Sequence, residues 1–378
     1  VMRQVHFSTA ARRCIDLVFF VNGIPVATVE LKTDFTQSLD EAIAQYRKDR
    51  HPMTNGRPEP LLSFGHRALV HFAVSNDLAA MTTKLEGEKT HFLPFNMGYK
   101  GGAGNPPGEG GRSATAYLWE RVWDKNAWLM IIGRLMIVES KQEWDVATGT
   151  SVRRTRMLFP RFHQWEAVTK IVDAVRDEGV GHKYLIEHSA GSGKTNTIAW
   201  TAHRLARLHV DDVKVFDSVI VVVDRTVLDG QLQEAIRQID GSGKIVATIS
   251  PEDVRKAGAK SKSNLLATAL KNGELIIAVT VQTFPHALDE IRTSTSLKGR
   301  RFAVIADEAH SSQSGQISSK LKAVLTAEEL AEVEDTGEVD VEAILASEMT
   351  ERAASENVSF FAFTATPKDK TLTRFGGP

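Results

Sequence analysis

The sequence contains the segment His188-Ser-Ala-Gly-Ser-Gly-Lys-Thr195, which joins an apolar run at residues 184–186 to a pattern of apolar side chains at helical spacing. A strand, a glycine-rich loop and a helix in this order are typical of a phosphate-binding loop. Gly191 and Gly193 allow the backbone to curl, so that successive N–H groups point at phosphate oxygens. The helix that follows adds the positive end of its dipole. The alternative is an ordinary Gly/Ser turn.

The residues around these glycines have expected roles in binding ATP and Mg²⁺. The loop at Ala190 and Ser192 would surround the phosphates. Lys194 can reach the β- and γ-phosphates, and the hydroxyl of Thr195 can ligate Mg²⁺. His188 stands where the usual pattern has its first glycine, a departure that matches the looser helicase version of this loop.

Composition places the chain among globular proteins. It has 378 residues, 42% hydrophobic and 25% charged, which suits two or three domains with real cores. A net charge of −1 means that any nucleic-acid contact must come from a local groove. The single cysteine, Cys14, excludes an internal disulfide and fits a reducing cytosol. The sequence shows neither a run of 18 apolar residues nor a signal peptide, so we expect no membrane association. Because it begins at Val1 and ends on Gly-Gly-Pro378, we expect a piece of a longer protein.

Five apolar runs follow the loop along the chain. Their near-continuous apolarity and the helical segments between them predict a parallel sheet covered on both faces. The runs are residues 218–223, 245–249, 275–280, 302–306 and 359–364.

Polar motifs stand where those runs end, as ligand sites of open α/β sheets do. Asp307 can hold Mg²⁺ through water, and Glu308 can align and deprotonate the water that attacks the γ-phosphate. An acidic pair that merely caps a helix is the alternative. Ahead of the loop, Gln164 has the amide that could recognise adenine, although a glutamine there could also be an ordinary surface residue.

Other strand ends carry residues suited to a nucleic-acid backbone. Arg225 and Thr283 follow two of the apolar runs, and their guanidinium and hydroxyl groups suit phosphate oxygens. Thr364 and Thr366 end the last run and could sense the γ-phosphate through His310.

The N-terminal part begins with a predicted hairpin. Two β-rich runs, residues 15–21 and 24–32, are separated by Asn22-Gly23, which is a strong turn signal. The second run ends in Glu30-Leu-Lys32, and Asp16 lies on the first run.

These polar residues match a metal-dependent phosphodiesterase. Asp16 and Glu30 can hold Mg²⁺, while Lys32 orients water or neutralises charge. A solvated hairpin with ordinary charges is the alternative. A two-residue turn puts Asp16 opposite Val29, on the other face from Glu30. A three-residue loop puts Asp16 opposite Thr28, with Glu30 as its diagonal neighbour. We therefore predict the three-residue loop, or a bulge with the same effect.

A helix and a third strand complete this part. Ser38 and Glu41 predict a capping box, and the basic end of the helix at residues 47–51 either contacts DNA or is solvated. Residues 68–74 read as a strand, and residues 98–113 as an irregular Gly/Pro loop. We place the junction between about 140 and 158, which gives domains 1–150 and 151–378.

With these motifs in place, the sequence resembles known families. The series of Gln164, Gly191–Thr195, Asp224-Arg225, Asp307–His310 and Thr364–Thr366 looks like the first, RecA-like motor domain of a superfamily 2 helicase of the DEAH-box type. The upstream Asp16…Glu30-x-Lys32 on a strand, strand, helix, strand order resembles the PD-(D/E)xK nuclease fold. Together they resemble the restriction (R, motor) subunit of type I restriction–modification enzymes.

The resemblance implies an ATP-driven translocase of double-stranded DNA that does not separate the strands. It implies Mg²⁺-dependent cleavage far from the recognition site, in a complex with methyltransferase and specificity subunits in the prokaryotic cytoplasm. No second motor domain follows Thr366, so we expect this chain to bind nucleotide but hydrolyse it poorly. Two alternatives remain open: a stand-alone helicase-like ATPase whose N-terminal domain has no chemistry, and a non-enzymatic DNA-binding scaffold.

Overall fold

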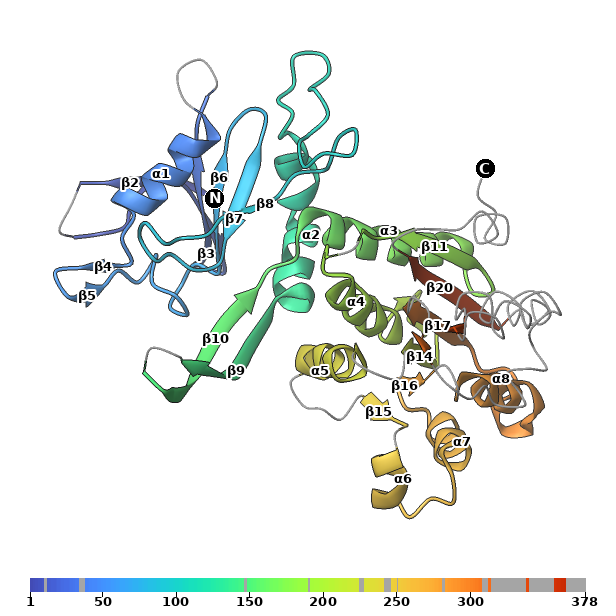
Figure 1. Ribbon diagram of the computed structural model, residues 1–378. Coiled ribbons are helices and arrows are strands. Elements are labelled where there is room, and N and C mark those ends of the chain that lie inside the picture. The colour runs from blue at the N-terminus through green and yellow to red at the C-terminus, as the bar shows by residue number, and fades with distance from the viewer. Residues whose placement is uncertain are drawn as a thin grey trace. The chain divides into compact units, whose positions relative to one another are not determined.

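The computed structural model describes residues 1–9, 12–33, 38–145, 148–189, 191–223, 228–240, 246–249, 251–280, 283–307, 312–313, 338–339 and 357–364. Contacts divide the chain into two compact units, Val1–Trp165 and Glu166–Pro378 (Figure 1). The division falls inside α3 (Phe162–Glu178), and the functional boundary expected between residues 150 and 151 stays a prediction.

The first unit is built on a six-stranded mixed sheet in the order β1-β2-β3-β6-β7-β8. Its strands pair antiparallel except for β3 and β6, which run parallel and are joined through α1 (Leu39–Asp49). This is the predicted order of strand, strand, helix and strand. The strands are β1 (Met2–His6), β2 (Cys14–Val21), β3 (Ile24–Leu31), β6 (Val70–Val74), β7 (Ala79–Thr82) and β8 (Leu93–Pro94).

The turn between β2 and β3 is tight, and a bulge follows it. Val21 pairs with Ile24 across Asn22-Gly23, whose φ angles of 50° and 80° are those of a left-handed hairpin turn. The predicted three-residue loop is therefore wrong. The register then shifts, because Phe20 pairs with Pro25 but Phe19 pairs with Ala27. The hairpin contains instead the bulge that we gave as the alternative.

Helix α1 packs on one face of this sheet. The Ser38 N–H donates to the Glu41 carboxylate at 2.8 Å, as predicted for a capping box. Ala42 and Tyr46 are fully buried in a core that includes Ala73 of β6. The preceding residue on that strand, Phe72, points to the opposite face.

An aromatic cluster covers that opposite face. Phe72 makes edge-to-face contacts with Phe95, Trp123 and Phe159, at centroid distances of 5.4–5.8 Å. Two π-helices, η1 (Leu118–Val122) and η2 (Ile131–Leu135), flank α2 (Lys125–Met130) in this region. The predicted junction region forms a long hairpin, β9 (Ile137–Asp145) with β10 (Thr150–Leu158). A short pair, β4 (Met53–Thr54) and β5 (Arg57–Pro58), completes the unit.

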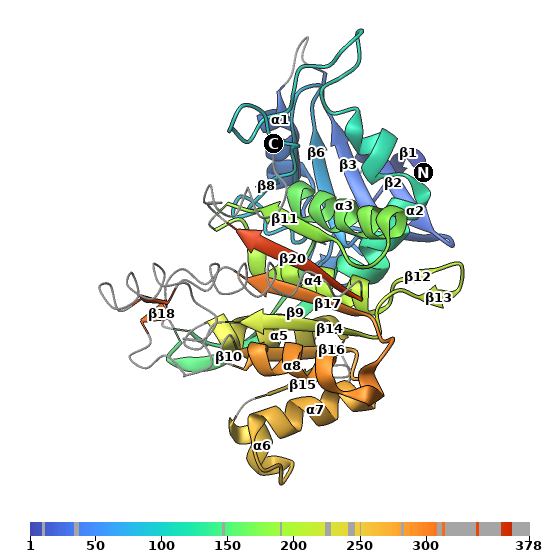
Figure 2. The same ribbon diagram turned by 90° about the vertical axis from the view of Figure 1, so that its right-hand side faces the viewer.

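The second unit contains the predicted parallel sheet. Its six strands lie side by side in the order β11-β20-β17-β14-β16-β15, and every described pair is parallel (Figure 2). The strands are β11 (Lys183–Glu187), β14 (Ser218–Val223), β15 (Val246–Thr248), β16 (Ile276–Thr280), β17 (Phe302–Asp307) and β20 (Val358–Thr364).

Helices cover both faces of this sheet, which explains its continuous apolar strands. Alternate residues of β14 enter different cores: Val219 and Val221 join one cluster, and Ile220 and Val222 join the other. The first cluster includes residues of α3, α4 (Lys194–Ala206) and α5 (Leu228–Asp240). The second includes residues of α7 (Lys262–Asn272) and α8 (Phe284–Thr293). The predicted fold class is confirmed.

The remaining described elements of this unit are short. They are β12 (His209–Val210), β13 (Val213–Lys214), α6 (Pro251–Lys256), the 3₁₀-helix η3 (Thr295–Leu297), β18 (Ser312–Gln313) and β19 (Glu338–Val339). Within the described ranges, every helix is too short or too polar to cross a bilayer.

Candidate functional site

The phosphate-binding loop follows β11 and leads into α4, as predicted. Gly191 and Gly193 both have left-handed backbone, with φ of 73° and 85°. Gly193 is the N-cap of α4, so Lys194 and Thr195 stand in the first turn of the helix. The loop therefore has the curled backbone that can surround an anion at a helix N-terminus.

Lys194 and Asp307 are brought together by the parallel sheet. Asp307 is the last residue of β17, and the Lys194 ammonium lies 2.9 Å from its carboxylate. Their side chains are 19% and 7% exposed, so the pair is largely shielded from water. A triphosphate would offer oxygens to this lysine and would leave the carboxylate available for Mg²⁺. The half-buried Thr195 is positioned in the same turn as the lysine.

Two threonines predicted for DNA contact or coupling are buried, Thr283 at the start of α8 and Thr364 at the end of β20. Thr283 is 4% exposed, and its hydroxyl hydrogen-bonds with that of Thr280 at 3.0 Å. Thr364 is fully buried at the end of β20, and its carbonyl accepts from the His188 N–H at 2.6 Å. The predicted residues Ala190, Arg225, Glu308, His310 and Thr366 lie outside the described residues.

Gln164 is part of the first unit. It is 5% exposed, and its side-chain carbonyl accepts from the Arg161 N–H at 2.9 Å. The amide thus contacts the chain at the start of α3, and its predicted role in adenine recognition stays a prediction.

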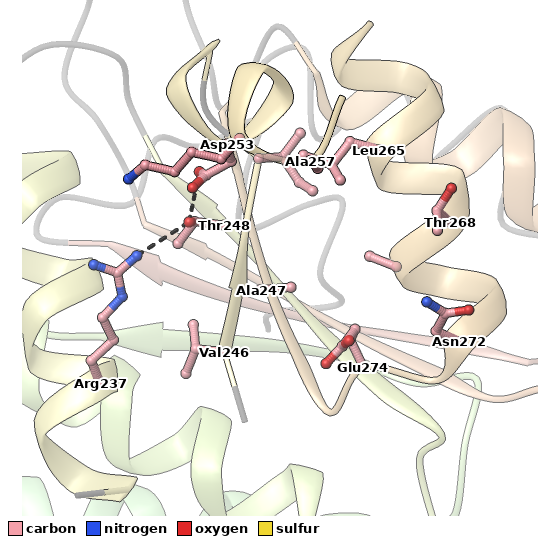
Figure 3. A pocket seen from close by; sticks show the side chains of 13 residues that line it. Arg237, Val246, Ala247, Thr248, Asp253, Ala257, Leu265, Thr268, Asn272 and Glu274 are labelled. Carbon is pink, nitrogen blue, oxygen red and sulfur yellow. Dashed lines mark hydrogen bonds between the residues drawn. The ribbon is translucent and has the colours of Figure 1, made fainter. Parts of the chain in front are cut away.

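A cavity of about 550 Å³ lies beside β15 (Figure 3). Arg237 donates to the Thr248 hydroxyl at 3.2 Å, and that hydroxyl donates to Asp253 at 2.7 Å. These bonds join α5, β15 and α6. Because β15 and β11 are the two outermost strands of the sheet, this cavity is distinct from the phosphate-binding loop.

The predicted nuclease residues lie on the α1 face of the first sheet. With the bulge, Leu17 pairs with Val29, and the same register continued by one residue puts Asp16 directly opposite Glu30. Asp16 is half-buried and accepts from the Leu31 N–H at 2.9 Å and from the Gln4 side chain at 3.0 Å. The two carboxylates are therefore direct cross-strand neighbours, closer than the diagonal arrangement that we predicted.

Glu30 is fully buried and paired with Arg50. The Arg50 Nε donates to Glu30 Oε1 at 2.7 Å, and its Nη2 donates to the Cys14 carbonyl at 2.7 Å. Burial raises the pKa of the Glu30 carboxyl from 4.5 to about 7. The hydrogen bond and charge of Arg50 oppose that shift, and the charge of Asp16 adds to it.

The second oxygen of Glu30 makes this a candidate divalent metal site. Oε2 is buried and has no hydrogen-bond donor, although the same carboxylate interacts with that of Asp16. Mg²⁺ suits such a pair, because it binds through one or two carboxylates and keeps several waters. Among the described residues no group of three or more His, Cys, Asp or Glu side chains could hold a metal. Lys32 is half-buried just beyond β3, and its N–H donates to the Val74 carbonyl at 2.8 Å.

Arg50 is the residue that sequence reasoning missed. We interpreted the basic segment at 47–51 as solvated or in contact with DNA, but Arg50 is 5% exposed. Residues 26–30 of β3 are all buried, and a carboxylate in such a strand needs a cation. This need for a cation was the signal in the sequence, and the basic segment at 47–51 is the nearest one that could supply the partner of Glu30.

Comparisons with known proteins match both units. Residues 163–377 match the SWI2/SNF2 ATPase family, and residues 1–90 match the type I restriction enzyme R protein N terminus. The chain is 25% identical over 322 residues to the type I restriction enzyme HindI endonuclease subunit of Haemophilus influenzae, covering 82% of the chain and 27% of that protein.

Two further relatives are also named as endonuclease subunits of type I restriction enzymes. A putative type I restriction enzyme MjaVIIIP endonuclease subunit of Methanocaldococcus jannaschii is 22% identical, with 82% of the chain and 28% of the relative covered. The SauMSSORF170P endonuclease subunit of Staphylococcus aureus is 24% identical, with 85% and 30% covered. The chain thus spans less than a third of the length of these relatives. The resemblance to type I restriction subunits that the sequence predicts is confirmed.

Proposed function

The chain belongs to the SWI2/SNF2 ATPase family, and from this premise we propose that it acts as the restriction subunit of a type I restriction–modification enzyme. In that role it would use ATP to translocate double-stranded DNA and would cleave the DNA with Mg²⁺. We assign the cleavage to residues 1–150 and the motor to residues 151–378, which include Gln164.

The motor role is supported by the loop and by the Lys194–Asp307 pair. Lys194 would move from Asp307 to the β- and γ-phosphates, and Thr195 with Asp307 would hold Mg²⁺. Gln164 would recognise adenine. Glu308 would align and deprotonate the attacking water.

The nuclease role is supported above all by one observation: a buried carboxylate, Glu30, with an unsatisfied oxygen beside Asp16. Such an oxygen carries a desolvation cost that a bound cation would remove. A divalent ion there would lower the pKa of a bound water and stabilise charge at the phosphate. Lys32 would orient that water or neutralise the developing charge.

The remaining predicted residues belong to DNA contact and coupling. We propose that Arg225 and Thr283 contact the DNA backbone, and that Thr364 and Thr366 sense the γ-phosphate through His310. The partners would be double-stranded DNA and the methyltransferase and specificity subunits, in the prokaryotic cytoplasm.

The test is DNA cleavage by the complete complex carrying Asp16→Ala or Lys194→Ala. Asp16→Ala should abolish cleavage and preserve ATP hydrolysis, because it removes a metal ligand of the nuclease. Lys194→Ala should abolish both ATP hydrolysis and the cleavage that depends on translocation. Cleavage that survives Asp16→Ala would refute the assigned nuclease site.

A second candidate is a helicase-like ATPase whose first unit has no chemistry. It is favoured by the Arg50 guanidinium, which already occupies one oxygen of Glu30. Glu30→Ala and Lys32→Ala decide between the two candidates. A loss of Mg²⁺-dependent nicking with intact ATP binding supports the nuclease. Absence of nicking already in the wild type, or nicking that neither substitution changes, supports the second candidate.

A further inference from the structure

We propose that His188 is a positioning residue of the ATP site: its imidazole fastens the tip of the phosphate-binding loop to α4, so that ATP meets a loop already curled. The inference rests on the proposed ATP site. It concerns a residue that stands in place of the usual first glycine of the loop.

The backbone explains why histidine is tolerated at this position. The left-handed conformations of the described loop fall on Gly191 and Gly193, and His188 is not among the residues with positive φ. A Cβ at position 188 therefore carries no backbone strain of the kind that glycine avoids. The loop gains a side chain there without losing its curl.

The imidazole contacts one residue of the loop and one residue of the helix that follows it. Nδ1 hydrogen-bonds with the Ser192 hydroxyl, and Nε2 hydrogen-bonds with the Thr197 hydroxyl at 3.0 Å. Ser192 lies in the loop, while Thr197 is fully buried in α4. His188 itself is 4% exposed. The imidazole ring thus connects the loop to the helix.

The hydroxyl protons of the two partners determine the direction of both hydrogen bonds that the His188 ring makes. The Ser192 hydroxyl donates its single proton to the Ser189 carbonyl, so towards His188 it acts as the acceptor. Nδ1 of His188 must then carry the proton. In the neutral ring Nε2 is an acceptor, and the Thr197 hydroxyl donates to it at 3.0 Å in preference to the Gly193 carbonyl, which lies farther away at 3.5 Å.

The main chain of His188 is fastened as well. Its N–H donates to the Thr364 carbonyl at 2.6 Å, which extends the pairing of β11 with β20 by one residue. The base of the loop is therefore held by the sheet, and its tip is held by the imidazole. The sheet contact survives any substitution at 188 except proline, so the side chain can be tested separately.

Loss of the imidazole should weaken nucleotide binding rather than slow the chemical step. A loop that is free to open must be ordered when ATP binds, and this ordering reduces affinity. Two hydrogen bonds of ordinary strength correspond to roughly tenfold weaker binding. His188→Ala should raise the Kd for a non-hydrolysable ATP analogue by about that factor.

His203 provides a matched control for loss of a buried histidine. It is also 4% exposed and lies on α4, and its Nε2 hydrogen-bonds with the Ile236 carbonyl of α5 at 2.6 Å. His203→Ala and His188→Ala should both lower the Tm of the 378-residue chain. Only His188→Ala should raise the Kd, as measured by calorimetric titration of the analogue with Mg²⁺. Equal effects of the two variants on Kd, or no effect of His188→Ala, would overturn the proposal.

Thr197→Val keeps the test decisive if His188→Ala fails to fold. Valine preserves the shape of threonine and removes the hydroxyl partner of Nε2. We expect a several-fold higher Kd, and the double variant should be less than additive, because both changes break the same contact. Full additivity would overturn the proposal. Lys194→Ala tests the ATP site itself: unchanged affinity in that variant refutes the site, whereas affinity that depends on Lys194 but not on His188 refutes the inference alone.

Discussion

Arg50 Nε lies 2.7 Å from Glu30 Oε1, and the two side chains are 5% and 0% exposed. The pair joins the residue after α1 to the central strand β3 of the first sheet. Arg50 also donates to the Cys14 carbonyl of β2 and lies 5.5 Å from the centroid of the Phe7 ring. The Arg50 guanidinium therefore compensates the buried charge of Glu30 and holds three segments of the first unit together.

Removing Arg50 should strongly destabilise the first unit. Arg50→Met leaves Glu30 buried without its cation, which in comparable pairs costs about 3–5 kcal/mol. Arg13→Met is the matched control, because its pair with Asp49 is 52% and 46% exposed and should contribute about 1 kcal/mol or less. Urea unfolding of both variants measures the difference. Equal destabilisation would show that the buried pair does not carry the effect.

Glu30 should make stability fall as pH rises. Its folded pKa of about 7 exceeds the ordinary 4.5, so between these values the folded chain binds more protons than the unfolded chain. The contribution is complete below pH 4.5 and is lost as pH rises through 7. Glu30→Gln removes this term. The stability difference between wild type and variant should change by up to about 1.4 kcal/mol per pH unit inside this window. A difference independent of pH would contradict the prediction.

His71 should act in the opposite direction. Burial lowers its pKa from 6.5 to about 3, so the folded chain binds fewer protons than the unfolded chain between these values. This contribution is complete above pH 6.5 and is lost as pH falls towards 3. His71→Gln removes the term, so relative to wild type the variant should gain stability as the solution is acidified. The comparison is the pH dependence of urea midpoints for the two proteins, and an unchanged profile would count against a neutral buried imidazole.

The nuclease candidate shows what the sequence could predict and what it could not. The turn signal at Asn22-Gly23 located the hairpin, and alternation put Glu30 and Lys32 on one face. The register depended on a single inserted residue within β3, which local patterns do not specify. Arg50 was missed because its partner is distant in sequence, and a basic helix end is usually solvated.

The parallel sheet was easier to predict than the residues around its ligand loop. Strands buried on both faces are apolar throughout, so β14 and β17 were recognisable from composition alone. The contact of His188 with Thr197 depends on how the loop folds back over the first turn of α4. The sequence marked His188 only as a departure from the usual glycine.

Asp307 should control how nucleotide binding depends on Mg²⁺. Its carboxylate lies 2.9 Å from the Lys194 ammonium, so a triphosphate must compete with it for the lysine and also meets its negative charge. Asp307→Asn removes both obstacles, and ATP should bind several-fold more tightly than to wild type when Mg²⁺ is chelated. With Mg²⁺ present the affinity of the variant for ATP should rise little, because the variant lacks the carboxylate that would hold the ion.

Nucleotide titrations with and without Mg²⁺ on wild type and variant measure this dependence. Glu290→Gln is the control, since it breaks the 2.9 Å pair between Lys271 and Glu290 in the same unit, away from the loop. It should leave the ratio of the two affinities unchanged. If Asp307→Asn retained the wild-type ratio, the carboxylate at the end of β17 would not be the magnesium-holding group. The lysine pairing would then be only a structural contact.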